Sequence, residues 1–191
     1  IPLTGKFADA DSELAARLVT TKGNIDLLLY PSLAPQAVTN FLNHLLGGDY
    51  NDMVFHRHSA GFVIQGGSIH ANLATNNLFN IQNRFPSPIN EPGISNLKGT
   101  VAAAKTGARS SLYPVKNDNG TAVLDNLGAQ VYAAKEDSFG YVGNPDSATT
   151  DFFISLADNS ANLDNQNSGF TAYARVAGFG VSGHPVVSAI T

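Results

Sequence analysis

The stretch FHRHSAGFVIQGGS at residues 55–68 decides most of what the sequence says about the fold. Two short apolar runs, residues 53–57 and 62–65, flank four residues that have the size and the glycine of a hairpin loop. The pattern predicts two antiparallel strands. It also places a permanently charged guanidinium, Arg57, among apolar strand residues, and an amide, Gln65, on the neighbouring strand.

Arg57 and Gln65 can be interpreted in two ways. In the first, Arg57 lies on an edge strand with its head group in solvent, and Gln65 closes a bend at Gly66 and Gly67. In the second, the two polar side chains form part of a functional site, because charged groups held among apolar ones often do so. Taken without further context, the residue types leave both interpretations open.

Regular elements are expected on both sides of this hairpin. Residues 34–46 carry apolar side chains three or four positions apart, from Val38 to Leu45, which predicts an amphipathic helix. Further strands are expected in a hairpin at 18–30 and at 99–105, 152–156 and 172–176. One helix, several strands and no alternation of strand and helix favour a mostly antiparallel β architecture that closes into a barrel.

Length and composition bound the class of protein. The 191 residues are enough for one domain, and 43% hydrophobic against 14% charged residues describes a chain that folds. Eleven Lys and Arg against 15 Asp and Glu give a net charge of −4, which disfavours nucleic acid as a partner. The absence of cysteine excludes disulfides and every thiol-based site. No apolar run is long enough to span a bilayer, so no membrane association is expected.

The chain is expected to comprise an N-terminal leader, residues 1–13, and a single domain, residues 14–191. The numbering opens at Ile1 rather than at a methionine, which leaves room for a removed signal peptide. A periplasmic or secreted location is therefore favoured over a cytoplasmic one.

Two other patterns are weaker. Residues 178–183 match GxGxxG, but a dinucleotide site needs an acidic residue about 20 positions further on and the sequence ends at Thr191, so a flexible loop is expected. His56 and His58 share one face of a strand, yet two imidazoles without a third ligand do not make a catalytic zinc site. No metal site is predicted.

The segment FHRHSAGFVIQGG resembles the FHR(V/I)xxxFM(I/C)QGG signature of the cyclophilin peptidyl-prolyl isomerases, and the resemblance extends from about residue 19 to residue 176. It implies an eight-stranded antiparallel closed barrel capped by two helices. Four further stretches follow in the family's order: residues 34–50 (AP…NF…L…GxY), 99–104 (GT(I/L)AMA), 151–154 (SQFFI) and 162–164 (WLD or FLD).

The resemblance also implies roles for individual residues. Arg57 corresponds to the catalytic arginine, and Gln65 would hold that arginine or the substrate carbonyl. Of the others, Phe62, Val63, Phe153 and Leu163 would wall the proline pocket, and Ala104 and Lys105 would present backbone to an extended peptide. The implied substrate-binding residues are Phe62, Val63, Ala104, Lys105, Asp151, Phe153, Asn162, Leu163 and Phe170.

The sequence departs from the family pattern at four of these positions. Val63 replaces the usual Met, and Lys105 stands near the usual Asn or Arg. Asp151 takes the place of Gln, and Asn162 that of Trp or Phe. The last two departures imply altered peptide contacts and weak cyclosporin binding, whereas the arginine is retained.

The implied function is isomerisation of X-Pro peptide bonds in protein folding, without metal or cofactor, by a monomer that acts on Pro-containing peptides and unfolded proteins. An alternative from another class is a cyclophilin-like binding module or chaperone with little turnover. A structural barrel without a site would require the block at residues 55–67 to be coincidence.

Residues 107–143 are far longer than the loop that the similar bacterial cyclophilins have at this position. We therefore expect an insertion. Loops longer than about 12 to 15 residues are usually functional or disordered. The aromatic and aliphatic content of this one favours packing on the barrel beside the site, where it would extend the peptide groove.

Overall fold

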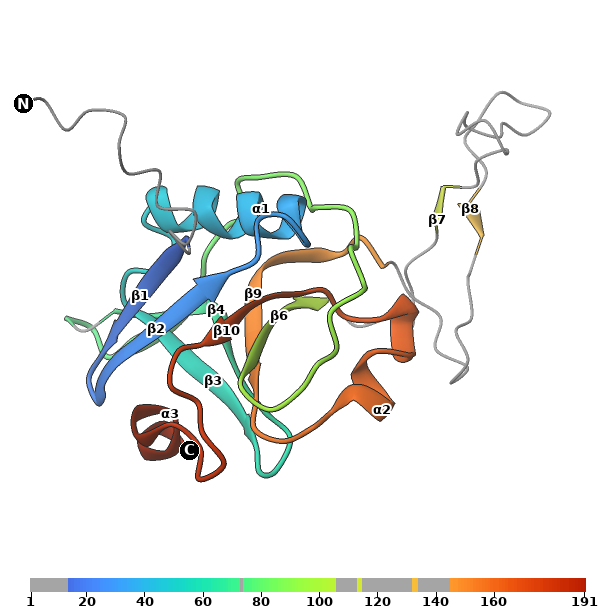
Figure 1. Cartoon of the computed structure of the whole chain (residues 1–191). Helices are drawn as coiled ribbons and strands as arrows, with labels where there is room; N and C mark the ends of the chain where they lie inside the picture. Colours follow the sequence, from blue (N-terminus) through green and yellow to red (C-terminus); the bar gives the residue numbers. More distant parts are fainter. Residues whose placement is uncertain (1–13, 73, 106–112, 115–131, 134–144) are drawn as a thin grey trace, which may run out of the picture.

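A computed structural model of the chain describes residues 14–72, 74–105, 113–114, 132–133 and 145–191 (Figure 1). Its dominant feature is one curled antiparallel sheet with the strand order β1-β2-β10-β6-β9-β4-β3, and β5 pairs with β4. The strands of this sheet are β1 (Ala15–Thr20), β2 (Gly23–Leu29), β3 (Met53–Ser59), β4 (Val63–Asn72), β5 (Asn77–Asn80), β6 (Thr100–Lys105), β9 (Ala148–Ser155) and β10 (Ala172–Val176). The helices are α1 (Pro35–Leu46), α2 (Ser160–Leu163), the short 3-10 helix η2 (Gln166–Ser168) and α3 (Pro185–Ile190).

The expected leader, residues 1–13, lies outside the described residues. So does the expected insertion at residues 107–143, except for two short strands, β7 (Tyr113–Pro114) and β8 (Tyr132–Ala133). These two strands pair with each other in a separate antiparallel sheet.

The expected hairpin at residues 18–30 is confirmed as β1 and β2, and it begins earlier than predicted. Its register runs from the pair Ala15 and Leu28 to the pair Thr20 and Gly23. Gly23 has a φ of +126°, which a side chain would disfavour, and this glycine turns the chain into β2. The alternation of Ile25 with polar neighbours then directs one face of the hairpin into the core.

The predicted helix is also confirmed, as α1. Its first turn has no side-chain cap of its own. Instead the Glu91 carboxylate, from a distant loop, accepts the backbone N–H groups of Gln36 and Ala37 at distances of 3.0 to 3.1 Å. The buried face, which includes Phe41 and His44, packs on β9 and β10 and covers one side of the curled sheet (Figure 1).

The middle strands of the sheet bury side chains on both faces. On the inner face, Phe152 of β9 and Ile64 of β4 join the main core. On the outer face, Phe153 and Val63 belong to a second and smaller cluster. Neighbouring residues of one strand point to opposite faces, so each apolar run supplies both clusters at once.

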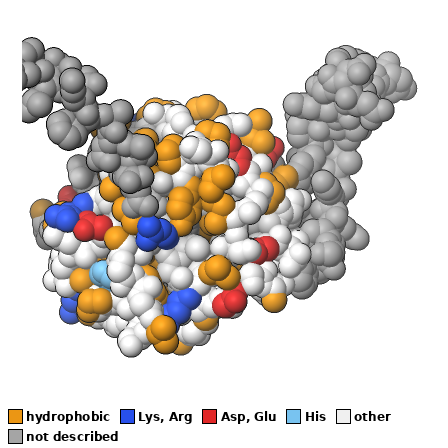
Figure 2. Space-filling model, in the orientation of Figure 1, with side chains coloured by type: hydrophobic (Ala, Val, Ile, Leu, Met, Phe, Trp, Pro, Cys, Tyr) orange, Lys and Arg blue, Asp and Glu red, His pale blue; other side chains and the backbone are white. Residues whose placement is uncertain are grey.

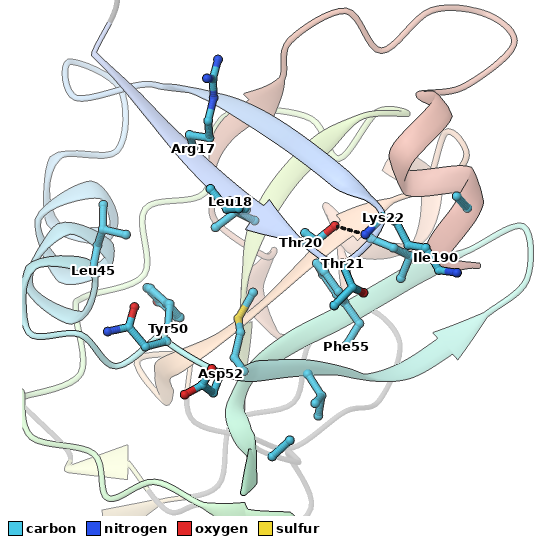
Figure 3. Close-up of a pocket in the computed structure, with 16 residues that line it drawn as sticks. Arg17, Leu18, Thr20, Thr21, Lys22, Leu45, Tyr50, Asp52, Phe55 and Ile190 are labelled. Atoms are coloured by element: carbon cyan, nitrogen blue, oxygen red, sulfur yellow. Dashed lines mark hydrogen bonds between the residues drawn. The ribbon is translucent and has the colours of Figure 1, made fainter. Parts of the chain in front are cut away.

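The sheet is not the closed barrel that was expected. Among the described residues no strand bridges β1 and β3, which remain the two edges of an open, curled sheet. A cavity of about 890 Å³ lies between these edges, and side chains from β1, β3 and the ends of α1 and α3 line it, among them Leu18, Leu45, Phe55 and Ile190 (Figure 3). The described part also holds three α-helices rather than the two expected.

Several elements were not predicted. Strand β4 runs on to Asn72, and β5 pairs with its far end from Ile69 to Asn72. The predicted loop at residues 178–183 is a turn with a single bridge between Gly180 and Gly183, and α3 follows it.

No helix in the described part of the chain has the length and apolarity needed to cross a membrane. On the face shown in Figure 2, Lys and Arg side chains stand apart from one another, and hydrophobic side chains gather over the middle.

A buried polar network joins α1 to the strands that follow it. His44 is fully buried and its Nδ1 donates to Asp49 Oδ2 at 2.8 Å. The other carboxylate oxygen accepts from Arg84, and the Asp49 carbonyl accepts from His70 Nε2 at 2.7 Å. Burial acts to raise the pKa of Asp49, but the hydrogen bonds from His44 and Arg84 outweigh it and hold the pKa below its usual value.

Replacing Asp49 by Asn is expected to lower the free energy of unfolding at pH 7 by about 1.5 to 3 kcal/mol, since it removes charged hydrogen bonds. A carboxyl whose pKa is depressed in the folded state stabilises that state above its unfolded pKa and ceases to do so as pH falls through the folded value. The difference between wild type and Asp49→Asn should therefore shrink below the ordinary pKa of 3.8. Chemical denaturation between pH 7 and pH 3 measures it.

Asp52→Asn is the matched control, because Asp52 is an exposed neighbour and no ion pair involves it within the described residues. A gap between wild type and Asp49→Asn that stayed constant down to pH 3 would contradict the role assigned to the network.

Candidate active site

A bulge in β3 determines how Arg57 is presented. Phe55 pairs with Gly66 while Arg57 pairs with Gln65, so the two residues are two positions apart on β3 but their partners are adjacent on β4. Residues two apart in a regular strand share a face, and the extra residue cancels that relation. As a result Phe55 packs on the inner core, whereas Arg57 is exposed on the other side of the sheet.

Arg57 begins a row of residues that runs straight across the sheet. It pairs with Gln65 of β4, which pairs with Phe153 of β9. Phe153 in turn pairs with Ala102 of β6, and Ala102 pairs with Ala172 of β10. Directly paired residues lie on the same face, with Cβ atoms about 4.5 to 5.5 Å apart. The register alone therefore puts a guanidinium, an amide and a phenyl ring side by side on the outer face.

The apolar part of this row widens into a compact cluster, which we call the site-face cluster. Its central ring, Phe153, is only 4% exposed. Phe170 meets that ring edge-on, with centroids 5.6 Å apart. The buried members are Val63, Ala102, Ala104, Phe153, Leu163 and Ala172, and the half-buried Phe62, Ile94 and Phe170 pack against them.

The loops that complete the cluster are tied together by buried amides. Asn159 donates from Nδ2 to the Phe62 carbonyl at 2.9 Å, and its backbone N–H donates to the Asn96 carbonyl at the same distance. Asn96 is fully buried and donates from Nδ2 to the Phe170 carbonyl at 3.0 Å and to Asp164 Oδ1 at 2.9 Å. Three separate segments are thereby held around one apolar surface.

Lys105 has a defined place beside this cluster. Its ammonium donates to the carbonyls of Asn167 and Gly169 at 2.9 and 2.5 Å. The same ammonium lies 5.0 Å from the centroid of the Phe170 ring. The side chain thus links the end of β6 to the loop that carries Phe170.

Asp151 lies two residues before Phe153 on β9 and so on the same face. Its Oδ1 accepts the backbone N–H of Ser68 at 2.6 Å. Gly67 makes this close approach possible, because a Cβ at residue 67 would lie 2.5 Å from the Thr150 carbonyl oxygen and 2.6 Å from the Asp151 Cα. The carboxylate is therefore anchored by one oxygen.

The structure brings most of the predicted residues together. Arg57 and Gln65 are neighbours in the row, although no hydrogen bond joins their side chains within the part of the chain described. Asn162 is the exception, since it is exposed on α2 and accepts a hydrogen bond from Gln166 of η2. The predicted residues found in or against the site-face cluster are Phe62, Val63, Ala104, Phe153, Leu163 and Phe170.

Sequence reasoning missed several residues of this site. Ala102 shares a face with Ala104 at period two, so strand alternation alone was enough to find it. Ile94 and Asn96 lie in a stretch without any periodicity, and no local signal points to them. Among the described residues no group of three or more His, Cys, Asp or Glu is arranged to hold a metal ion.

The family model described as cyclophilin-type peptidyl-prolyl cis-trans isomerase matches residues 16–191. The chain belongs to this family. The function of this cyclophilin domain is accordingly peptidyl-prolyl cis-trans isomerisation.

The peptidyl-prolyl cis-trans isomerase of Acinetobacter baylyi is 28% identical over 173 residues, which cover 88% of this chain and 69% of that protein. Isomerase A of Dickeya dadantii is 32% identical over 166 residues, which cover 83% of this chain and 63% of that protein.

Solved structures agree with the fold. A cyclophilin-type isomerase of Cryptosporidium parvum, crystallised in the presence of the dipeptide Ala-Pro, aligns with a TM-score of 0.55 at 17% identity. The alignment covers 93% of this chain and 84% of that one. At this identity the likeness establishes a cyclophilin-like fold.

Replacing Gly67 by Ala tests whether the close contact of β4 with β9 stabilises the sheet that carries the site-face cluster. Gly67 has a φ of +135°, and its new Cβ would overlap β9 backbone. Gly61→Ala is the matched control, since Gly61 has a φ of +67° but a Cβ added there would meet no atom within 4 Å. Gly67→Ala should lower the free energy of unfolding by about 1 to 3 kcal/mol more than the control. Equal losses in denaturant unfolding would show that the contact does not matter.

Proposed function

We propose that this cyclophilin domain catalyses rotation about X-Pro peptide bonds with Arg57 as the catalytic donor and the site-face cluster as the proline pocket. The observation that carries the proposal is the row of paired residues in which Arg57, Gln65 and Phe153 follow one another across three strands. This row supports the proposal because the backbone of the charged donor is in register with the apolar site-face cluster.

The chemistry of the peptide bond explains why such a pair is needed. Rotation is opposed by about 18 to 20 kcal/mol because the nitrogen lone pair is delocalised into the carbonyl. In the twisted transition state the lone pair is localised on the proline nitrogen, and a donor aimed at that nitrogen stabilises this state more than either planar state. A guanidinium remains charged at every physiological pH, so Arg57 acts without transferring a proton.

The apolar residues meet the second requirement, a pocket that binds the proline ring. Phe62, Phe153 and Leu163 would hold the ring and exclude water, which strengthens the hydrogen bond from the arginine. Gln65 would hold the guanidinium or the substrate carbonyl. Ala104 would offer backbone groups to an extended peptide.

Further contacts of the peptide are proposed at the residues that depart from the family pattern. Lys105, Asp151 and Asn162 would lie along the bound peptide on either side of the pocket, with Val63 and Phe170 completing its wall. The one carboxylate oxygen of Asp151 that does not bind Ser68 would face the peptide.

We also propose that residues 14–191 form one domain that acts as a monomer on Pro-containing segments of unfolded proteins. The insertion expected at residues 107–143 belongs to this proposal, as a segment that extends the groove for the peptide. The dipeptide Ala-Pro used with the Cryptosporidium protein supports a proline-containing ligand.

Replacing Arg57 by Ala is expected to lower kcat/KM by about 10² to 10³, the usual loss for one preorganised donor to a transition state. The fold should be unaffected, because Arg57 is exposed and its side chain donates no hydrogen bond to another described residue. A protease-coupled assay on an Ala-Pro-Phe peptide measures the rate, and thermal unfolding checks the fold.

Arg57→Lys is the control for charge, since it keeps a cation but loses the planar donor, and only partial activity should remain. An Arg57→Ala variant with nearly full turnover would contradict the mechanism. If wild type itself bound the peptide without turnover, the domain would be a binding module for proline-containing segments instead.

Cyclosporin should inhibit this protein at least about tenfold more weakly than it inhibits family members with Trp at the position of Asn162, a difference that corresponds to about 1.4 kcal/mol. A buried aromatic contributes about 150 to 250 Å² of contact, most of which Asn lacks. Asp151 adds a charge that an apolar ligand would desolvate. Titration of the drug against activity decides this, and Asn162→Trp should strengthen inhibition. Unchanged inhibition in that variant would contradict the argument.

A further inference from the structure

A small cavity of about 200 Å³ lies directly behind one wall of the site-face cluster. It is bounded by two loops, one before β6 and one after α2. Two of its lining residues, Ile94 and Phe170, also pack against the site-face cluster. The full lining consists of Pro92, Gly93, Ile94, Ser95, Asp164, Gly169 and Phe170. The cavity therefore adjoins the proposed proline pocket and shares the Phe170 ring with it.

The shape of this cavity suits one side chain. Pockets for small molecules usually enclose about 300 to 1,000 Å³, which is more than this one provides. The passage between the loops is narrow, because a Cβ on Gly169 would lie 2.9 Å from the Asp164 carbonyl oxygen and 3.0 Å from Pro92 Cβ. A slender, unbranched side chain fits such a space better than a ring.

The lining combines apolar side chains with backbone groups, the Ser95 hydroxyl and one carboxylate. Asp164 is half-buried, and its Oδ1 accepts two hydrogen bonds from Asn96, at 2.8 and 2.9 Å. Its Oδ2 accepts no hydrogen bond from the described residues, and none of the ion pairs among them involves Asp164. The carbonyl of Gly169 is already used by Lys105 and Asn90. Asp164 carries the one charged group of the lining, and its Oδ2 is thus an anionic atom with capacity to accept from a ligand.

We propose that this cavity is a second subsite for the peptide, which receives the side chain of a lysine or arginine that flanks the proline. The inference rests on the proposed function. The methylene stem of a basic side chain would lie against Pro92, Ile94 and Phe170, while its charged end would meet Asp164 Oδ2. A neutral apolar side chain would instead desolvate that oxygen without replacing its hydrogen bonds.

Binding of matched peptides tests this inference. Two sets of short Xaa-Pro peptides carry Lys, Met or Glu either directly before or directly after proline, so that Lys and Met differ in charge at similar length. Calorimetric titration at low salt should show that the Lys peptide of one set binds wild type about fivefold more tightly than the Met peptide, as for a partly exposed ion pair. The Glu peptide should bind more weakly than either.

Three variants locate the source of this preference. Asp164→Asn keeps an oxygen for Asn96 but removes the charge, and it should reduce the Lys-to-Met ratio to about one. Asp158→Asn removes an exposed carboxylate that binds Ser160 outside the cavity, and the ratio should persist. A preference that survived Asp164→Asn and disappeared in Asp151→Asn would overturn the proposal.

A measurement on wild type keeps the test decisive if Asp164→Asn does not fold. In NMR titrations the Lys peptide should shift the amide signals of Gly93, Ile94 and Gly169 more than the Met peptide does, and equal shifts would overturn the proposal. Turnover of the same peptides is measured separately. Binding with a Lys preference but no turnover would contradict the proposed function alone, and turnover without the preference would contradict the subsite alone.

Discussion

The site depends on the register shift within β3. Phe55 meets the ring of Phe152 edge-on in the core, with centroids 6.1 Å apart, and this contact fixes which face of β3 points inward. In a regular strand Arg57 would share that face, and an unpaired guanidinium in the core would cost several kcal/mol. One extra residue on β3 reconciles the two requirements, because Phe55 stays in the core while Arg57 reaches the outer face.

The middle strands of the sheet bury side chains on both of its faces. In β9, Phe152 fills the inner core and the adjacent Phe153 fills the outer cluster. In β6, the side chain of Val101 packs in the inner core and that of Ala102 in the outer cluster. Strands buried on both faces read as continuous apolar runs instead of alternating patterns. The floor of the proposed pocket therefore belongs to the same strands as the core.

These facts explain what could be predicted from the sequence. The helix at α1 and the strands around residues 55–68 follow from local periodicity, and the resemblance to cyclophilins adds a candidate role for Arg57. The open edges of the sheet could not be predicted, because strand order depends on contacts between distant segments. The roles of Asn96 and Ile94 could not be predicted either, because they depend on hydrogen bonds and packing with residues far along the chain.

The two walls of the proposed pocket differ in what holds them. The sheet wall is fixed by backbone ladders and by packing on the core. The loop wall, which carries Leu163 and Phe170, is held by polar tethers from Asn96, Asn159 and Lys105. Apart from the bonds between Asn96 and the Asp164 carboxylate, each tether ends on a backbone carbonyl or on a backbone N–H. The geometry of this wall therefore depends weakly on the apolar side chains of Leu163 and Phe170. In the proposed mechanism the donor Arg57 thus lies on the sheet, and changes in the loop residues would alter substrate preference without disturbing it.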